Sequence, residues 1–252
     1  MQRNNVWHLL AAAAALLALS ACGGADADGE TEASAELQYN QSLAILPSPN
    51  DLAFAGSTDG TLNGTGNAAV DATDGFSTTA SATATATVPL DPDSVEGGTS
   101  VRVFAVDTVD ATGSPADPND AANPGPKAVG GIDTSADLDG DGELTPGMEY
   151  RASVSAADRN NRTVAVTPLT ALQPDTTYMV VLTDALRTQD GEPVSASDAY
   201  ADAMGADPLV QSQLSVAGAA GVNTDEVIAS WTFTTQTVGR TLDRVRAAVQ
   251  GE

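Results

Sequence analysis

Residues 227–235 of the sequence are Val-Ile-Ala-Ser-Trp-Thr-Phe-Thr-Thr, and this stretch carries the clearest signal for the fold. Apolar side chains occupy the odd positions up to 233, and Ser or Thr occupies the even positions from 230 to 234. Successive side chains of a strand point to opposite faces of a sheet, so the pattern predicts a half-buried strand. Trp231 and Phe233 share a face with Val227 and Ala229, which favours a core position for both aromatic residues over a ligand platform.

Similar alternating or β-branched runs recur along the chain from residue 80 onward, separated by turns rich in Gly, Pro and Asp. The predicted strands are residues 80–88, 101–106, 150–156, 163–167, 177–183 and 227–235. Short strands between turns predict an all-β fold, specifically an immunoglobulin-like β-sandwich. The many Ser and Thr residues are expected on sheet faces that stay in contact with water.

Two stretches favour helices instead. Residues 195–221 are Ala-rich, and Asp207-Pro208 is typical of an N-cap followed by proline at the first helical position. At the C-terminus, Leu242, Val245 and Val249 have helical spacing. The sequence therefore predicts a small helical insert within the sandwich and an amphipathic helix over residues 237–252.

The N-terminal segment has the features of a secretion signal. An apolar run over residues 9–19 follows Arg3 and is too short to span a bilayer comfortably, so residues 1–21 are predicted to be a signal peptide. Leu19-Ser20-Ala21-Cys22 resembles the bacterial lipobox, which implies that Cys22 is acylated and begins the mature chain. The alternative is an ordinary signal peptide that leaves a free thiol. Residues 22–36 contain no aliphatic side chain larger than Ala and are predicted to form a flexible tether after the acylated Cys22.

The charge and composition exclude several functions. Lys and Arg number 10 and Asp and Glu number 34, so the formal net charge is 10 − 34 = −24. Such a surface repels phosphate backbones, which argues against nucleic-acid binding. The one Cys and the one His, Cys22 and His8, both belong to the N-terminal segment. The body of the chain therefore has no residues for a disulfide, a Cys-based zinc site or a Ser-His-Asp triad.

An acidic loop stands out in the middle of the chain. Asp137-Leu138-Asp139-Gly140-Asp141-Gly142 has the D-x-D-x-D-G spacing of a calcium loop, in which alternating carboxylates turn toward one centre and Gly142 permits a sharp turn. Glu143 would contribute its backbone carbonyl. The twelfth position is Met148, so the closing acid could only be Glu149, one residue late. The candidate ligands are Asp137, Asp139, Asp141, Glu143, Thr145 and Glu149.

Calcium is thus the one candidate cofactor, and the alternative is a solvated acidic turn in an acidic protein. A calcium ion here is expected to stabilise the fold rather than to switch it. The other paired acids, Asp91/Asp93 and Asp117/Asp120, lie among Pro and Gly, and turn chemistry explains them without a catalytic role.

Several stretches together resemble the N-terminal domain of the bacterial virulence-factor lipases, a family of extracellular lipases. They are Pro47–Leu52, Gly56–Asn63, Asp74–Thr79, Leu90–Pro92, Ser100–Phe104, Thr176–Thr183 and Ser230–Gln236. Their order and spacing extend over residues 37–236, and the resemblance implies an Ig-like domain over that range. Within the family this domain precedes an α/β-hydrolase domain that carries the activity. The given sequence has no Gly-x-Ser-x-Gly and no His after position 8, so no catalytic residue is carried over.

These observations lead to three functional hypotheses. The first is a non-catalytic surface lipoprotein module that accompanies a hydrolase domain or a separate lipase, held in the outer membrane or at the cell surface of a Gram-negative bacterium through Cys22. The alternative is an N-terminal fragment of an outer-membrane lipase or lysophospholipase whose hydrolase domain lies beyond Glu252. The third is a calcium-dependent adhesin, which rests on the acidic loop and the Ig-like similarity.

Overall fold

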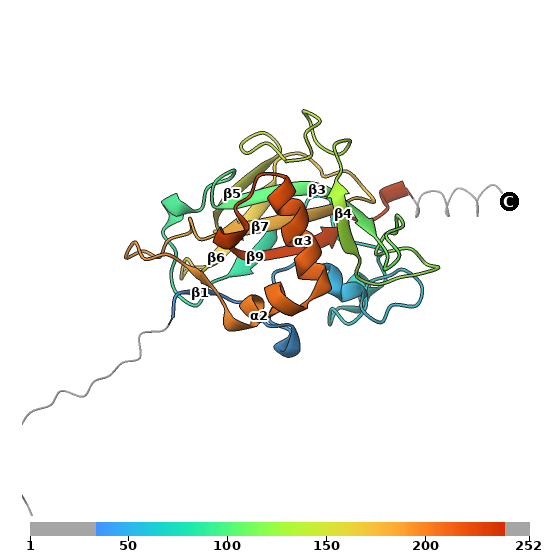
Figure 1. Cartoon of the computed structure of the whole chain (residues 1–252), viewed down its shortest axis with the longest axis horizontal. Helices are drawn as coiled ribbons and strands as arrows, with labels where there is room; N and C mark the ends of the chain where they lie inside the picture. Colours follow the sequence, from blue (N-terminus) through green and yellow to red (C-terminus); the bar gives the residue numbers. More distant parts are fainter. Residues whose placement is uncertain (1–33, 240–252) are drawn as a thin grey trace, which may run out of the picture. The chain divides into compact units, whose positions relative to one another are not determined.

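The computed structural model of the protein describes residues 34–239; the predicted signal peptide, Cys22 and residues 240–252 lie outside the described part. The described chain is mixed and mostly β, with three small sheets (Figure 1). The largest is antiparallel, with the order β4 (Ala128–Ile132), β3 (Val101–Val109), β7 (Thr177–Thr183) and β9 (Val227–Thr234). The second is also antiparallel, with the order β2 (Ala82–Thr85), β6 (Thr163–Pro168) and β5 (Tyr150–Val154). The third pairs β1 (Glu36–Leu37) with β8 (Ser195–Ala196) in parallel.

Every predicted strand overlaps an observed strand, because each was placed on a local alternating or β-branched run, although β1, β4 (Ala128–Ile132) and β8 were not predicted. The run over 177–183 is β7 from end to end, whereas the run over 80–88 shortens to the four residues of β2. β1 begins at Glu36, the last residue of the predicted tether. The described chain thus confirms the strand positions, and the immunoglobulin-like sandwich remains a prediction.

The helical insert is confirmed as two helices, α2 (Asp198–Ala206) and α3 (Pro208–Ala219). The Asp207 side chain accepts a hydrogen bond from the amide of Leu209 at 2.9 Å, and Pro208 occupies the first turn, as the sequence predicted. A short helix α1 (Ala68–Asp71) and four 3-10 turns complete the described elements. These turns are η1 (Gln41–Leu43), η2 (Asp51–Phe54), η3 (Pro92–Ser94) and η4 (Thr224–Glu226). Of the predicted C-terminal helix, only residues 237–239 are described.

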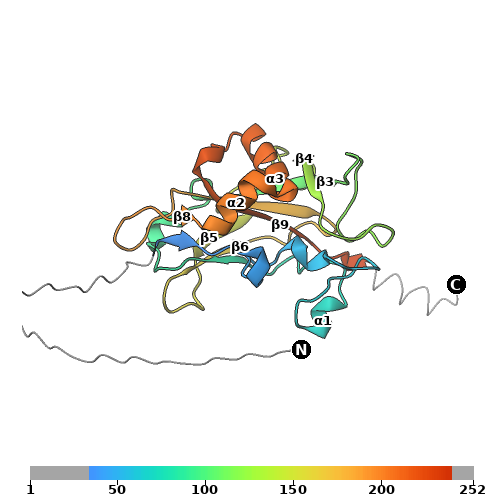
Figure 2. The same cartoon turned by 60° about the horizontal axis from the view of Figure 1, so that its bottom comes forward.

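The four-stranded sheet lies between two layers. Figure 2 shows α2 and α3 on one side of it and the strands β5 and β6 on the other, and α3 packs against β4 and β9. All residues of β7 and β9 are consequently buried. The expectation that one face of each sheet meets water is therefore wrong for β9, whose Ser230, Thr232 and Thr234 are at most 6% exposed.

Hydrogen bonds replace water on this polar face. Ser230 Oγ lies 2.7 Å from the Tyr200 hydroxyl and donates to Gln213 Oε1 at 2.7 Å, which joins β9 to α2 and α3. The Thr234 hydroxyl lies 2.8 Å from that of Thr177 on β7. Burying hydroxyl groups costs little once each has a partner, so a Ser/Thr-rich face can still be part of a core.

Candidate metal centre

The acidic loop is an excursion from the edge of the four-stranded sheet. β4 pairs with the second half of β3, and after the loop, Glu143 forms an antiparallel bridge with Phe104 on the same edge. Ala105 of β3 binds both ends of the loop. Its carbonyl accepts a hydrogen bond from the Asp133 amide and its amide donates one to the Gly142 carbonyl, each at 2.9 Å. Residues 133–142 therefore form a loop whose ends are fixed to one residue of a central strand.

Three carboxylates of the loop converge. Asp137, Asp139 and Asp141 each present an oxygen, and these oxygens lie within 4.8 Å of one another, close enough to hold a metal ion. Asp137 Oδ2 accepts hydrogen bonds from the amides of Gly140 (2.8 Å) and Asp141 (2.9 Å), which winds the loop around this side chain. The alternation Asp-x-Asp-x-Asp thus places the three acids as the sequence predicted, and the group could bind a metal.

One oxygen of the group is left without a partner. Asp137 Oδ1 is buried and receives no hydrogen bond within the described residues. The neighbouring carboxylates can satisfy it only by sharing a proton, since an ionised carboxylate offers no donor. A cation is the other group that would satisfy this oxygen, and Asp137 Oδ1 is the atom that points to a ligand here.

The electrostatics of the pair agree with a shared proton. The pKa of Asp139 is raised from its ordinary value, chiefly by its hydrogen bond to Asp137 and then by burial and the charge of Asp141. Burial acts to raise the pKa of Asp137, but the hydrogen bonds that this carboxyl receives within the loop outweigh burial and lower it. Of the two acids, Asp139 is therefore the one that takes up a proton more readily.

Gly142 has the role that the spacing predicted. Its φ is +84°, in the left-handed region that favours glycine, and a Cβ at this position would lie 2.0 Å from Ile132 Cγ2. Two residues after it, Leu144 is buried and its amide donates to the Val103 carbonyl at 2.9 Å. The turn therefore delivers the chain from the acidic group directly back to the sheet and the core.

The remaining predicted ligands lie outside the group of three. The Glu143 carboxylate binds Arg102 of β3, and the Thr145 hydroxyl donates to Asp139 Oδ2 at 3.4 Å. Glu149 is 5% exposed, and its two oxygens accept from the amides of Leu138 (3.0 Å) and Thr145 (2.7 Å). Glu149 therefore joins the two sides of the loop through the backbone, whereas the spacing had suggested a closing metal ligand; its role as a ligand remains a prediction.

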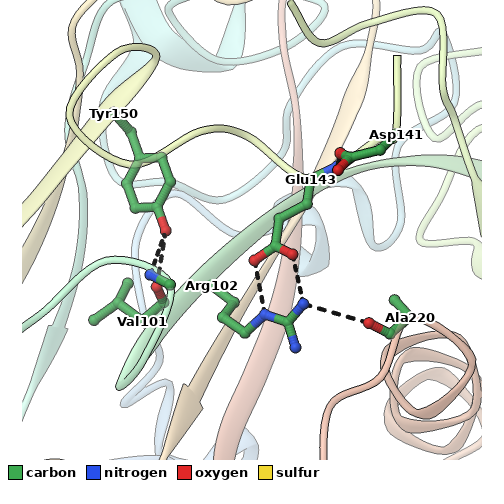
Figure 3. A network of polar contacts seen from close by, with 7 residues as sticks. Val101, Arg102, Asp141, Glu143, Tyr150 and Ala220 are labelled. Carbon is green, nitrogen blue, oxygen red and sulfur yellow. Dashed lines mark hydrogen bonds and ion pairs between the residues drawn. The ribbon is translucent and has the colours of Figure 1, made fainter. Parts of the chain in front are cut away.

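Arg102 is the residue of this site that the sequence did not single out. Its Nε and Nη2 donate to Oε1 and Oε2 of Glu143 at 2.7 and 2.5 Å, and Nη2 also donates to the Ala220 carbonyl at 3.3 Å (Figure 3). It lies 41 positions before Glu143, and its only sequence signal is a charged residue at the second position of a buried strand.

The other sequence-predicted positions are structural in the described chain. Trp231 and Phe233 are buried in the core, which confirms that prediction. Asp91 accepts from the Asp93 amide at 3.0 Å as the N-cap of η3, which confirms a turn role for that pair. Within residues 34–239, no helix has both the length and the hydrophobicity needed to cross a membrane.

Asp117 was predicted to be a turn residue only, but it also lines a cavity. The cavity measures about 350 Å³, and Asp107, Asp133 and Asp175 line it as well. Burial, and then the charges of neighbouring acids, raise the pKa of Asp107 and of Asp117. No side-chain nitrogen or oxygen of this cavity's residues is buried without a partner, in contrast to Asp137 in the acidic loop.

Comparison with known proteins gives a family for part of the chain. No curated protein matches the sequence. Among solved structures, the crystal structure of the S-layer protein rSbsC(31-844) matches with 16% sequence identity and a TM-score of 0.24. The match covers 47% of this chain and 11% of the S-layer chain. So low a TM-score does not define a shared fold. Residues 132–251, which include the acidic loop and the strands from β5 to β9, match the model of the family described as bacterial virulence factor lipase N-terminal.

Proposed function

We propose that this protein is a non-catalytic module of the virulence-factor lipase type, which accompanies a hydrolase domain or a separate lipase. The observation that carries the proposal is the family match over residues 132–251. The finer fold that goes with it is an immunoglobulin-like sandwich, for which the packing of the sheet β4-β3-β7-β9 over the sheet β2-β6-β5 is the support.

A non-catalytic role agrees with the chemistry of the side chains. Acyl transfer by a lipase needs a nucleophile, a histidine base and an oxyanion hole, and the given sequence has no His after position 8. The lipobox-like Cys22 supports attachment to a membrane by acyl chains, at the outer membrane or the cell surface. The tether that follows would hold the module away from the lipid.

The first experiment is an activity assay of the mature chain. The purified protein is expected to release no product above buffer from a nitrophenyl ester or a lysophospholipid, with or without calcium, while an authentic lipase assayed in parallel does. Turnover that increases in proportion to the amount of this protein would contradict the proposal. Reading the genomic DNA just after codon 252 tests the fragment alternative, which requires an in-frame hydrolase with Gly-x-Ser-x-Gly and a His.

We further propose that the acidic loop binds calcium. Oxygen donors are the ligands that Ca²⁺ prefers, and the loop offers three carboxylates within 4.8 Å together with the unpartnered Asp137 Oδ1. Mg²⁺ demands a tighter octahedral site and keeps several waters, so this exposed loop suits the larger ion. For an extracellular module we expect a dissociation constant of about 10⁻⁴–10⁻³ M.

The test is calorimetric titration of the mature chain with CaCl₂, with MgCl₂ as the comparison ion. We expect one site, lost in Asp139→Asn, and a rise of several degrees in Tm at 10 mM CaCl₂ that EDTA reverses. Asp202→Asn, on the exposed surface of α2, is the matched control and should bind calcium as the unmodified chain does. Equal heats in Asp139→Asn and the unmodified chain would exclude this loop.

A further inference from the structure

Arg102 is held on three sides at the base of the acidic loop. It makes a two-bond fork with Glu143, donates to the carbonyl of Ala220 at the C-cap of α3, and lies with its guanidinium carbon 5.0 Å from the centre of the Phe104 ring. The side chains of Arg102 and Glu143 are 18% and 25% exposed, and no other ion pair forms among the described residues. A bidentate fork fixes orientation as well as distance, which a single charge contact does not.

Glu143 connects Arg102 to the three acids of the candidate metal centre. It directly follows Gly142, which ends the turn, and its amide donates to Asp141 Oδ1 at 2.8 Å. The series of contacts from Arg102 to the three acids therefore runs through the side chain of Glu143, the amide of Glu143 and the carboxylate of Asp141 (Figure 3). The two links between residues are hydrogen bonds of 2.8 Å or less, and the step within Glu143 is covalent.

The loop needs such a hold because its acids repel one another. Three carboxylates within 4.8 Å favour an open loop whenever neither a proton nor a cation lies between them. A site that closes only when calcium arrives spends part of its binding energy on ordering the loop, whereas an ordered site does not. We propose that Arg102 is a positioning residue which, through Glu143, holds the loop in its cation-binding geometry before the cation binds. This inference rests on the proposed calcium function.

The direction in which calcium affinity changes when the Arg102 charge is removed distinguishes positioning from a long-range charge effect. Arg102→Met removes a positive charge beside the site and leaves the Glu143 carboxylate unpaired, so long-range electrostatics alone would tighten calcium binding. Loss of positioning weakens binding instead. Groups that orient metal ligands from outside the coordination shell typically contribute about 10–100-fold to metal affinity, so we expect Arg102→Met to bind calcium roughly tenfold more weakly.

The experiment is calcium titration of the mature chain and its variants, each checked for folding by circular dichroism. Arg102→Lys keeps the charge but not the fork, and it should also weaken binding, by a smaller factor. The double variant Arg102→Met/Glu143→Met leaves the net charge unchanged and should remain weakened. Arg151→Met, an exposed arginine on β5, is the matched control for charge and should bind at least as tightly as the unmodified chain.

Each outcome decides the question. Weaker binding in the fork variants, with an unchanged Arg151→Met, supports positioning. Equal or tighter binding in Arg102→Met overturns it while leaving the calcium site intact. A purely structural role would lower Tm equally with and without calcium, whereas positioning also reduces the calcium-induced rise in Tm. If Arg102→Met does not fold, Glu143→Gln weakens the same fork without removing the arginine, and undiminished binding there overturns the proposal. If the unmodified chain binds no calcium, the proposed calcium function itself fails.

Discussion

Asp51 of η2 accepts two hydrogen bonds from Thr234, the last residue of β9: one from the backbone amide at 2.7 Å and one from the hydroxyl at 3.1 Å. The two residues are 183 positions apart. Asp51 is 2% exposed, and burial raises the pKa of its carboxyl to about 6, although the bonds from Thr232 and Thr234 act to lower it. A buried acid thus attaches the N-terminal part of the domain to the end of its last strand.

Asp51 makes stability depend on pH in a defined direction. Its pKa in the folded state lies above the ordinary value of 3.8, so the folded state holds the proton more tightly than the unfolded chain. The associated stability is fully present below about pH 4 and is lost as the pH rises through 6. The difference amounts to on the order of 3 kcal/mol in the free energy of unfolding.

Asp51→Asn should remove this dependence, because the amide cannot ionise. We expect the difference in unfolding free energy between Asp51→Asn and the unmodified chain to shift in favour of the variant between pH 4 and pH 7, measured by urea denaturation. The exposed Asp202→Asn should show no such trend. A difference that stays constant over this pH range would contradict the buried-acid account.

The two glycines of the acidic loop should respond differently to alanine. Both Gly140 and Gly142 have φ near +80°, so each substitution costs about 1–2 kcal/mol of backbone strain. At Gly140 the nearest atom to a Cβ would be the Thr134 carbonyl oxygen at 3.8 Å, whereas at Gly142 a Cβ would lie 2.0 Å from Ile132 Cγ2. Gly142→Ala should therefore lower Tm more than Gly140→Ala in thermal unfolding. Equal losses would mean that Ile132 moves aside freely.

The hydroxyl of Tyr150 joins the two large sheets. It donates to the Val101 carbonyl of β3 at 2.8 Å and accepts from the Gly98 amide at 3.1 Å (Figure 3). Tyr150→Phe removes both of these bonds, while the Gly98 amide keeps its own 2.8 Å bond to the Val101 carbonyl, so we expect a loss of about 0.5–1.5 kcal/mol in the free energy of unfolding. Tyr39→Phe is the matched control, because its hydroxyl accepts from the exposed side chain of Gln41 and should cost less.

Calcium binding should compete with the proton that Asp139 takes up. Because the pKa of Asp139 is raised by its contact with Asp137, calcium must displace that proton as the pH falls, and affinity should decrease toward acid pH. Titration in buffers of different ionisation enthalpy should reveal proton release that grows as the pH is lowered. Asp141→Asn keeps the Asp137–Asp139 pair and should still release a proton in whatever binding remains. Affinity that is independent of pH below neutrality would argue against a shared proton.

Much of the local structure could be predicted, because the forces that set it act between near neighbours in the chain. Alternation placed β2 and β9, the Asp207-Pro208 pair placed the start of α3, and the Asp-x-Asp-x-Asp-Gly spacing brought three carboxylates together. Each of these signals spans fewer than ten residues. The prediction that one face of β9 contacts water was wrong, because the alternation within a strand does not show which elements cover it. In the structure, α2 and α3 lie over Ser230 and supply the hydrogen-bond partners that water would have supplied.

The sequence by itself determined where six of the nine described strands and the acidic loop lie, and its composition argues against a Ser-His-Asp triad and against nucleic-acid binding, both of which stay predictions. Only the tertiary structure decided the sheet order, the burial of Asp51 against Thr234 and the attachment of the loop to Arg102. These contacts join residues 41 to 183 positions apart. Propensity and alternation act over a few residues, whereas a distant partner is selected by the packing of whole layers, which brings two side chains together irrespective of their separation in the chain.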